Sequence, residues 1–547
     1  MFVDTTNFFL LAFYMELSIR AVVFLIGFII SCVFVNFPKD VKLGKSKYVL
    51  PLDYSVVPVA VVLILFATTC IPFVVVVRGL LGADSPDWAK DETSTSYLVP
   101  YTVVILFMTL AYVCMSAEHT KVFIFIANKF SRIALSSRNP SMVGLSLFTL
   151  LAAVFTLVTS NDIVILTLTP IILQFSKKTD PHLLLPLLLA EFCSANSFSA
   201  GLLSGNPSNI ILSSVFEIDF TTYLQYLLVP AILSGCVTYF YSLVLASRVC
   251  RKRDVPKEVE LPTLNTREEK AVEVKGETAV EVKEETTLNT QEEKPHSNEN
   301  TDAKQTVVTA PTAPNNDQVP LTLNAAFALG ILVALFCLFL FSTPIQNRWN
   351  FIEFWHIAVF VFFVTLIKDL VFYWREKRTI WIIVKSLPWK VPLFLFAMFI
   401  LVETASYFQF TSVIADAFAR WVVVPLVSWG EFPVAFVFNL ITCIACLVFN
   451  NLPATIFITR VISEKSVTDA LGTHLNLATF SVAAGTNFGA CILPNASLAG
   501  LMWSSLVKDS KTLKRVWMNG ALDCLLMVIV CSLVLIITSK FVHYFVC

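Results

Sequence analysis

The stretch that decides the fold is AEFCSANSFSAGLLSGNPSNIIL, residues 190–212, an apolar segment interrupted halfway by serine, glycine, asparagine and proline. A similar stretch, GTNFGACILPNASLAGLMW, occupies residues 485–503. Backbone groups that leave a helix find no water in lipid, so such interruptions persist only where they line a polar cavity inside the protein. Each stretch therefore predicts a transmembrane helix that is broken in the middle.

The composition of the whole chain is that of a membrane protein. Its 547 residues are 56% hydrophobic and only 14% charged, with 47 Phe and a mean hydropathy of +0.75, whereas soluble proteins average about 25% charged residues. This excludes a cytosolic enzyme, a nucleic-acid partner and a disordered chain, and the net charge of zero attracts no polyanion. We predict a multi-pass protein of the plasma membrane or an organelle membrane, with the lipid bilayer as its partner.

Runs of about 20 apolar residues are long enough to cross a bilayer, and ten such runs occur. We predict spans near 8–36, 54–81, 97–116, 183–216, 222–248, 323–344, 354–375, 391–410, 471–506 and 516–541. Two further apolar stretches, 142–177 and 432–462, are interrupted at their midpoints. The basic residues of the short loops fall on the cytoplasmic side only if 142–177 enters and leaves on one side. It is then a re-entrant hairpin, and 432–462 is its counterpart from the other side.

The two halves of the membrane region repeat one another. Three segments return 288 to 291 residues later: IANKFSR (126–132) as IADAFAR (414–420), LVTSNDIVILTLTPI (157–171) as LVFNNLPATIFITRV (447–461), and SANSFSAGLLSGNPSNI (194–210) as GTNFGACILPNASLAGL (485–501). Each half crosses the membrane five times, an odd number, so the halves must be inverted relative to each other. Inverted repeats with helices broken in corresponding places are typical of secondary transporters, whose substrate binds near the midplane.

The predicted spans and repeats divide the chain into four parts. They are an N-terminal span with a basic cytoplasmic loop (1–53), a first transporter repeat (54–249), a linker (250–322) and a second transporter repeat (323–547). The linker is charge-dense and poor in apolar residues, and TLNTREEK at 263–270 returns as TLNTQEEK at 287–294. Such a segment predicts a disordered cytoplasmic linker. The duplication fits either a tolerant linker or a regulatory docking segment.

The motifs at the breaks resemble those of the ion transporter superfamily, which includes arsenite permeases, sodium/proton antiporters, citrate and dicarboxylate carriers and the melanosomal P protein. The matching text is SNDIVILTLTPIIL (160–173), residues 190–212, LPWKVPLFLFAMFILVE (387–403), NNLPAT (450–455) and residues 485–503. The resemblance covers roughly 50–248 and 323–541. It implies an all-α polytopic protein with a scaffold and a transport domain, commonly a homodimer, that works by an elevator motion.

The resemblance also implies a binding site at the hairpin tips and the helix breaks. Its residues are Ser160, Asn161, Asp162, Asn196, Gly205, Asn206, Asn209, Asn450, Asn451, Thr486, Asn487, Asn495 and Ser497. The tips read Ser-Asn-Asp and Asn-Asn-Leu where sodium-coupled dicarboxylate carriers have Ser-Asn-Thr. These tip sequences argue against two sodium sites. They resemble the arsenite-permease and sodium/proton branch more closely. Asn495–Ala496 replaces the Ile-Gly pair usual in that branch.

Two carboxylates inside the predicted spans are candidates for proton coupling, because a charge in the membrane is expensive and marks function. Asp162 lies at a hairpin tip, where it can take a proton or cation; its alternative role is to cap the half-helix that follows. Glu191 precedes Asn196 by five residues and can carry a proton or make a structural hydrogen bond. Lys368 and Asp369 are expected to snorkel or to pair near the cytoplasmic end of their span.

Three classes of function follow from these observations. The first is a secondary active transporter of a small anion or oxyacid of the arsenite or citrate type, and the second is a sodium/proton antiporter of the same fold. A membrane enzyme or a passive channel is the third, although the midplane holds no His/Cys metal set. We expect no cofactor beyond a bound sodium ion or proton. Cys193 and Cys491 flank the breaks, and we expect them to act as small apolar residues rather than as ligands of arsenite.

Overall fold

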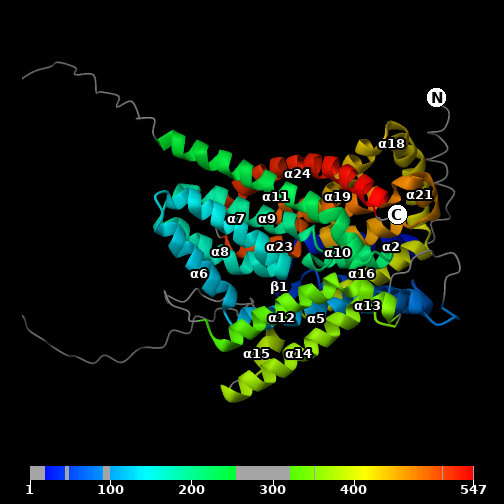
Figure 1. The fold of residues 1–547 in the computed structure, drawn as a ribbon. Coiled ribbons are helices and arrows are strands. Elements are labelled where there is room, and N and C mark those ends of the chain that lie inside the picture. The colour runs from blue at the N-terminus through cyan, green and yellow to red at the C-terminus, as the bar shows by residue number, and fades with distance from the viewer. Residues whose placement is uncertain are drawn as a thin grey trace, which may run out of the picture.

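The computed structural model describes residues 19–42, 49–89, 99–253, 321–349, 351–377, 379–507 and 509–545. These residues are almost entirely helical, and ten of their helices are long and apolar enough to cross a membrane. In Figure 1, α5, α12 and α14 run along one edge of the molecule and α11 and α24 along the opposite edge. The protein is therefore an integral, multi-pass membrane protein of the all-α class.

The first half of the chain forms a small hairpin of strands and a series of helices. Its elements are α2 (Ile19–Asn36), β1 (Lys39–Lys42), β2 (Val49–Leu52), α3 (Val56–Ala67), α4 (Phe73–Leu81), η1 (Gly82–Asp84), α5 (Pro100–His119), α6 (Val122–Leu135), α7 (Pro140–Val158), α8 (Asn161–Lys178), η2 (Pro181–Leu183), α9 (Leu184–Ser199), η3 (Leu203–Gly205), α10 (Pro207–Val215) and α11 (Phe220–Arg253). The strands are antiparallel, with Lys39 opposite Leu52.

The second half of the chain is helical throughout its described residues. Its elements are α12 (Leu323–Leu340), α13 (Ser342–Arg348), α14 (Phe354–Arg375), α15 (Trp381–Ser386), α16 (Lys390–Tyr407), α17 (Phe410–Phe418), η4 (Ala419–Val423), α18 (Val424–Trp429), α19 (Glu431–Phe449), α20 (Asn451–Ile462), α21 (Lys465–Leu471), η5 (Gly472–His474), α22 (Leu475–Phe488), η6 (Gly489–Cys491), η7 (Pro494–Ala496), α23 (Leu498–Leu506) and α24 (Ser510–Phe545).

Most predicted spans coincide with helices, and two regions differ. The span predicted at 54–81 is interrupted between α3 and α4, where Thr69 has a positive φ of 55° and Pro72 cannot donate a backbone hydrogen bond. Residues 411–429, which the sequence analysis left between spans, belong to a continuous helical stretch apolar enough to cross a membrane. The linker predicted at 250–322 lies outside the described residues except for its two ends.

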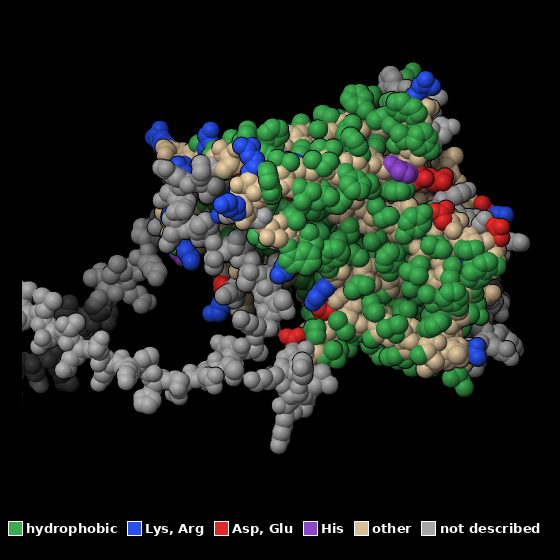
Figure 2. Space-filling model, turned by 90° about the horizontal axis from the view of Figure 1, so that it is seen from below, with side chains coloured by type: hydrophobic (Ala, Val, Ile, Leu, Met, Phe, Trp, Pro, Cys, Tyr) green, Lys and Arg blue, Asp and Glu red, His purple; other side chains and the backbone are tan. Residues whose placement is uncertain are grey.

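The surface of the protein is suited to lipid. Figure 2 shows hydrophobic side chains over most of the visible face, with lysine and arginine toward its margins. On α14, Phe360, Ile367 and Trp374 are 62%, 61% and 82% exposed. Contiguous apolar surface of this extent is rare on a soluble monomer, so these helix faces contact the hydrocarbon of the bilayer.

The segments around the predicted interruptions pack against each other across the two halves. Helices α7 and α8 meet at Thr159 and Ser160, and α19 and α20 meet at Asn450, so both stretches form helical hairpins. Helix α10 packs against α20, and α23 packs against α8. The second arm of each broken helix therefore contacts the returning arm of the hairpin from the opposite half.

The entrances to α6 and α17 have the same backbone geometry. Lys121 has φ 63° and ψ 19°, and Gln409 has φ 60° and ψ 16°. Left-handed conformations of this kind are uncommon outside glycine. The two residues are 288 positions apart, which is the spacing of the IANKFSR and IADAFAR segments that follow them. The sequence similarity is thus accompanied by the same local turn.

A buried ion pair joins α14 to α5. Lys368 Nζ lies 2.7 Å from Asp369 Oδ1, and both side chains are nearly inaccessible. Ser116 donates to the same carboxylate at 2.9 Å, and Tyr112 donates to its other oxygen at 3.1 Å. Of the two predicted alternatives, pairing is confirmed, and Lys368 does not snorkel. The pair is satisfied from both helices, so it fixes α14 against α5.

We predict that Asp369→Asn lowers stability by about 3–5 kcal/mol, because it leaves the Lys368 ammonium buried without its carboxylate. The matched control is Glu431→Gln, which breaks an exposed pair with Lys540 worth at most about 1 kcal/mol. Thermal unfolding of the purified protein in detergent compares the two variants. Equal shifts in their midpoints would contradict a stabilising role for the buried pair.

Candidate functional site

Asn487 is the centre of a buried network of amides. Its side-chain oxygen accepts hydrogen bonds from Ser199 Oγ at 2.8 Å and from Asn206 Nδ2 at 3.0 Å. Its nitrogen donates to Asn209 Oδ1 at 2.8 Å and to the Ala483 carbonyl, also at 2.8 Å. One side chain on α22 thus binds three residues at the break between α9 and α10, and it uses its full hydrogen-bonding capacity.

The break itself is built by side chains that replace lost helical hydrogen bonds. Asn209 Nδ2 donates to the carbonyls of Ser199 and Leu202, both at 2.8 Å. Asn206 is the N-cap of α10 and accepts from the Ser208 N–H. At Gly205 a Cβ atom would lie 2.5 Å from the Ser199 carbonyl oxygen, so only glycine fits there.

The tip of the first hairpin is connected to the same break. Asn161 Nδ2, at the start of α8, donates to Asn196 Oδ1 on α9 at 3.0 Å, and Asn161 Oδ1 accepts from the Asp162 N–H. Ser160 is the N-cap of α8, and its side chain makes no capping bond. Asp162 is therefore in the first helical turn and is not the cap. Its half-buried carboxyl lies near Tyr54, close enough for their charges to interact.

The predicted residues of the second tip form a separate group. Asn450 Nδ2 donates to the Asn495 carbonyl at 2.9 Å, and Ser497 caps α23 by accepting from the Gly500 N–H at 3.0 Å. The side-chain oxygens of Asn450 and Asn451 are buried without a hydrogen-bond partner. Among the described residues, no hydrogen bond links this group to Asn487. Packing of α10 against α20 brings the two groups to neighbouring elements.

The backbone of Asn450 is strained. Its φ is 70° and its ψ is 156°, a region that side-chain-bearing residues rarely adopt and that costs about 1–3 kcal/mol. The corresponding tip residue in the first half, Ser160, is in ordinary extended conformation. Strain of this kind persists only where the surroundings hold it, which marks the second tip as a constrained position.

Glu191 is buried on α9 next to the network. Thr169 Oγ1 donates to its Oε1 at 2.7 Å. Trp503 on α23 is the polar side chain close to it. The carboxyl therefore sits where α8, α9 and α23 meet.

Some residues of the network were not predicted. Ser199 binds Asn487, and Ser208 accepts from Thr486 Oγ1 at 3.3 Å. Both lie within the quoted motif, but serine is too common in helices to be selected by type. Asn439 was also missed: a Cβ on Gly485 would lie 2.5 Å from its carbonyl oxygen, and its Nδ2 has no partner. Only the close approach of α19 and α22 reveals it.

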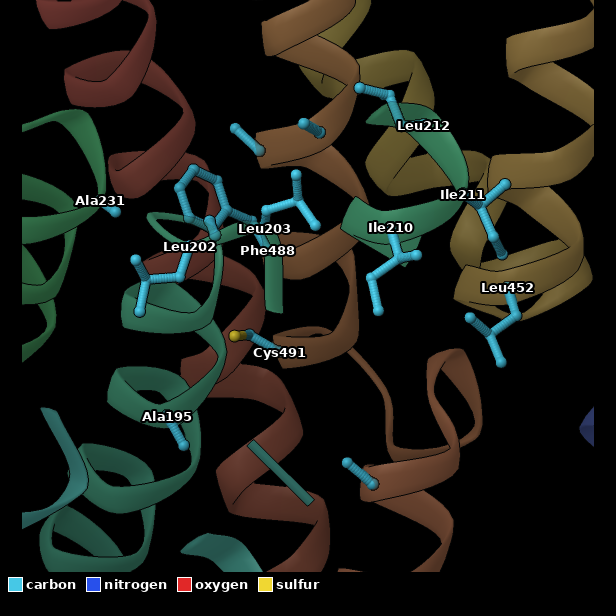
Figure 3. Packing of buried hydrophobic residues seen from close by; sticks show 14 of the residues in the cluster. Ala195, Leu202, Leu203, Ile210, Ile211, Leu212, Ala231, Leu452, Phe488 and Cys491 are labelled. Carbon is cyan, nitrogen blue, oxygen red and sulfur yellow. The ribbon is translucent and has the colours of Figure 1, made fainter. Parts of the chain in front are cut away.

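Apolar side chains enclose the break. Figure 3 shows Leu202, Leu203 and Phe488 gathered beside the broken segment, with Ile211 of α10 turned toward Leu452 of α20. All of these side chains are at most 4% exposed. An apolar enclosure strengthens the hydrogen bonds inside it and excludes competing water.

The chain belongs to the citrate transporter family, whose model matches residues 10–485. A protein of Dictyostelium discoideum named "Putative transporter arsB" is 33% identical over 88 residues, 16% of each chain. One of Bacillus subtilis (strain 168) named "Putative arsenical pump membrane protein" is 26% identical over 122 residues, 22% of this chain and 26% of its own. The chain thus spans about a quarter or less of these curated relatives.

These comparisons identify the class of protein. The chain is a membrane protein of the citrate transporter family, and the predicted resemblance to the citrate and arsenite branches of the superfamily is confirmed. Because the family consists of transporters, the enzyme alternative is excluded. The homodimer implied by the resemblance stays a prediction, as do the coupling ion and the roles of the individual site residues.

We predict that Asn487→Ala destabilises the protein by several kcal/mol, because it leaves Asn206 Nδ2 and Asn209 Oδ1 without their hydrogen-bond partner, and each orphaned buried group costs about 1–3 kcal/mol. The control is Asn519→Ala, which removes a half-buried hydrogen bond to Tyr241 on the outer side of α24. Thermal unfolding of both variants in detergent tests this. A loss no larger than that of the control would show that the network is not structural.

We predict that Asn450→Gly is about 1–2 kcal/mol more stable than Asn450→Ala. Both variants lose the contact to Asn495, but glycine adopts the strained backbone without cost, which outweighs its larger loss of backbone entropy. The measurement is the unfolding midpoint of the two variants side by side. If alanine is the more stable, the backbone of Asn450 is not strained.

Proposed function

We propose that this protein is a secondary active transporter of a small anion or oxyacid of the citrate or arsenite type, coupled to protons or sodium and working by an elevator motion. The observation that carries the proposal is the Asn487 network. Four polar residues from the broken α9–α10 segment and from α22 meet there with their side chains buried. Binding sites of secondary transporters lie between such breaks.

The packing supports two inverted repeats, 54–249 and 323–547, preceded by residues 1–53 and joined by a cytoplasmic linker at 250–322. Asn206 and Ser497 cap the second arms of the two broken helices and are 291 residues apart. Each second arm packs against the hairpin of the other half. Such reciprocal contacts are what a two-fold axis in the membrane plane would generate.

The chemistry of the site suits an oxygen-rich solute. The N-termini of α8 and α10 end at the network, and a helix N-terminus offers free N–H donors and partial positive charge to an anion. Amide side chains both donate and accept, so they can bind a carboxylate or the hydroxyls of a neutral oxyacid. We infer that substrate exchanges for some of the amide–amide hydrogen bonds around Asn487.

Asp162 provides a physical reason for coupling. A carboxylate in the first turn of α8 cancels the positive end of the helix and repels an approaching anion. A proton or a sodium ion bound to Asp162 removes this repulsion, so the cation and the anion bind together and move together. Glu191, buried next to the network, is the second candidate for carrying a proton.

In the elevator motion we assign α5, α12 and α14 to the scaffold, because the buried pair of Lys368 and Asp369 fixes α14 to α5. The hairpins, the broken helices, α11 and α24 form the moving part. The lipid-exposed face of α14 is consistent with a stationary frame.

The alternative is a sodium/proton antiporter of the same fold. It is favoured by the unpartnered oxygens of Asn450 and Asn451, which are cation ligands, and by the carboxyl of Asp162. In that case sodium and the proton compete for the tips, and no anion is carried.

The test is flux in proteoliposomes with citrate and with arsenite, under imposed proton or sodium gradients. We predict that Asp162→Asn abolishes gradient-driven accumulation, at least about tenfold, because an amide cannot exchange a proton. Asp509→Asn, an exposed carboxyl before α24, is the control. Sodium-evoked proton movement without flux of any solute would select the antiporter, and wild-type accumulation by Asp162→Asn would refute coupling at this residue.

A further inference from the structure

Another carboxyl is buried in the membrane region, and it is separate from the network and from the Lys368–Asp369 pair. Asp523 lies in α24 and is fully buried. Thr238 of α11 donates to its Oδ2 at 2.8 Å, and the thiol of Cys193 on α9 lies next to the carboxyl. Helices α11 and α24 pack along each other over much of their length, so this carboxyl is held at the crossing of the two longest helices.

Among the described residues, the groups that interact with this carboxyl include no basic side chain. The titratable groups that face it from the surrounding elements are Tyr241 of α11, Cys193 of α9, Cys491 of η6 and Cys524 of α24, with Cys443 of α19 behind the last of these. On its own helix the first basic residue toward the N-terminus is Arg515, about 12 Å away along the axis. A carboxylate here would be an unpaired buried charge, which costs several kcal/mol. A neutral acid avoids that cost.

Asp523 also lies next to the bend in the second broken helix, where α22 ends and η6 (Gly489–Cys491) begins. We call this bend the elbow. One turn earlier on α24, Gly520 is pressed against the backbone of Cys491, where a Cβ would lie 2.2 Å from the carbonyl oxygen. Cys491 follows Asn487 by four residues, and Cys193 precedes Asn196 by three. The thiols next to Asp523 therefore belong to the two segments that carry the amide network.

We propose that Asp523 is a proton-binding site that controls this elbow. In the structure described here α9, α11, η6 and α24 close around the neutral acid. When the proton is released to water, the carboxylate must be hydrated. Water that enters beside Cys193 and Cys491 then weakens the packing of the segments behind Asn487. Only the role of this site in transport rests on the proposed function, because proton binding itself needs no substrate.

The experiment measures maleimide labelling of the native protein in detergent from about pH 5 to about pH 9, with mass spectrometry to follow each thiol. The rates at buried Cys193 and Cys491 are divided by the rate at exposed Cys337, which cancels the effect of pH on thiols in general. In the wild type we expect this ratio to rise by up to about tenfold per pH unit while opening releases the proton, and to level off at the pH where the closed protein itself loses it. In Asp523→Asn we expect a flat ratio.

Two controls make the result specific. Asp509→Asn and Glu431→Gln, which change exposed carboxyls far from the thiols in sequence, should behave as the wild type. If Asp523→Asn does not fold, Thr238→Val replaces it: it keeps the carboxyl but removes the hydrogen bond that favours the ionised form, so the rise should move to higher pH. A carboxylic-acid C=O band in infrared difference spectra, absent from Asp523→Asn, gives independent support.

A ratio that is flat in the wild type, or that rises equally in Asp523→Asn, would overturn the proposal. Failure of the proposed function would look different. If labelling and infrared spectra respond to Asp523 but no solute is transported, the proton site stands and the transport role falls.

Discussion

The bilayer requires every backbone N–H and C=O to find its partner inside the protein, and this constraint governs the rest of the structure. Where α9 stops at Ser199, its free carbonyls are taken by Asn209, and the freed N–H groups of α10 are capped by Asn206. The asparagines that would contact a solute are therefore the same ones that make the interruption possible. This explains why amides, rather than charged side chains, concentrate at the breaks.

Fully partnered buried polar groups and partly partnered ones lie in different parts of the protein. The buried pair of Lys368 and Asp369 is fully partnered from two helices, whereas Asn450 and Asn451 each keep one oxygen without a partner. Buried polar groups are normally satisfied, so orphaned oxygens beside the helix ends are places where an added proton or cation improves the hydrogen bonding.

The sequence was sufficient to predict the breaks, both hairpins and most members of the network, because polar residues inside apolar runs have few explanations. It was insufficient for contacts that depend on distance between elements. Ser199 and Asn439 became visible only when α22 was placed against α9 and α19. Asp523 could not be predicted as a site, because the sequence of a long apolar helix does not show what faces a single acid in it. The interruption after Ala67 could not be predicted either, because it depends on one left-handed residue, Thr69.

The length of α11 has a consequence for the segment that follows it. Its 34 residues extend about 51 Å, against about 30 Å for the hydrocarbon of a bilayer. A helix of this length extends beyond the hydrocarbon even when it is tilted, so α11 itself carries the chain from the bilayer interior into the polar layer before it ends at Arg253.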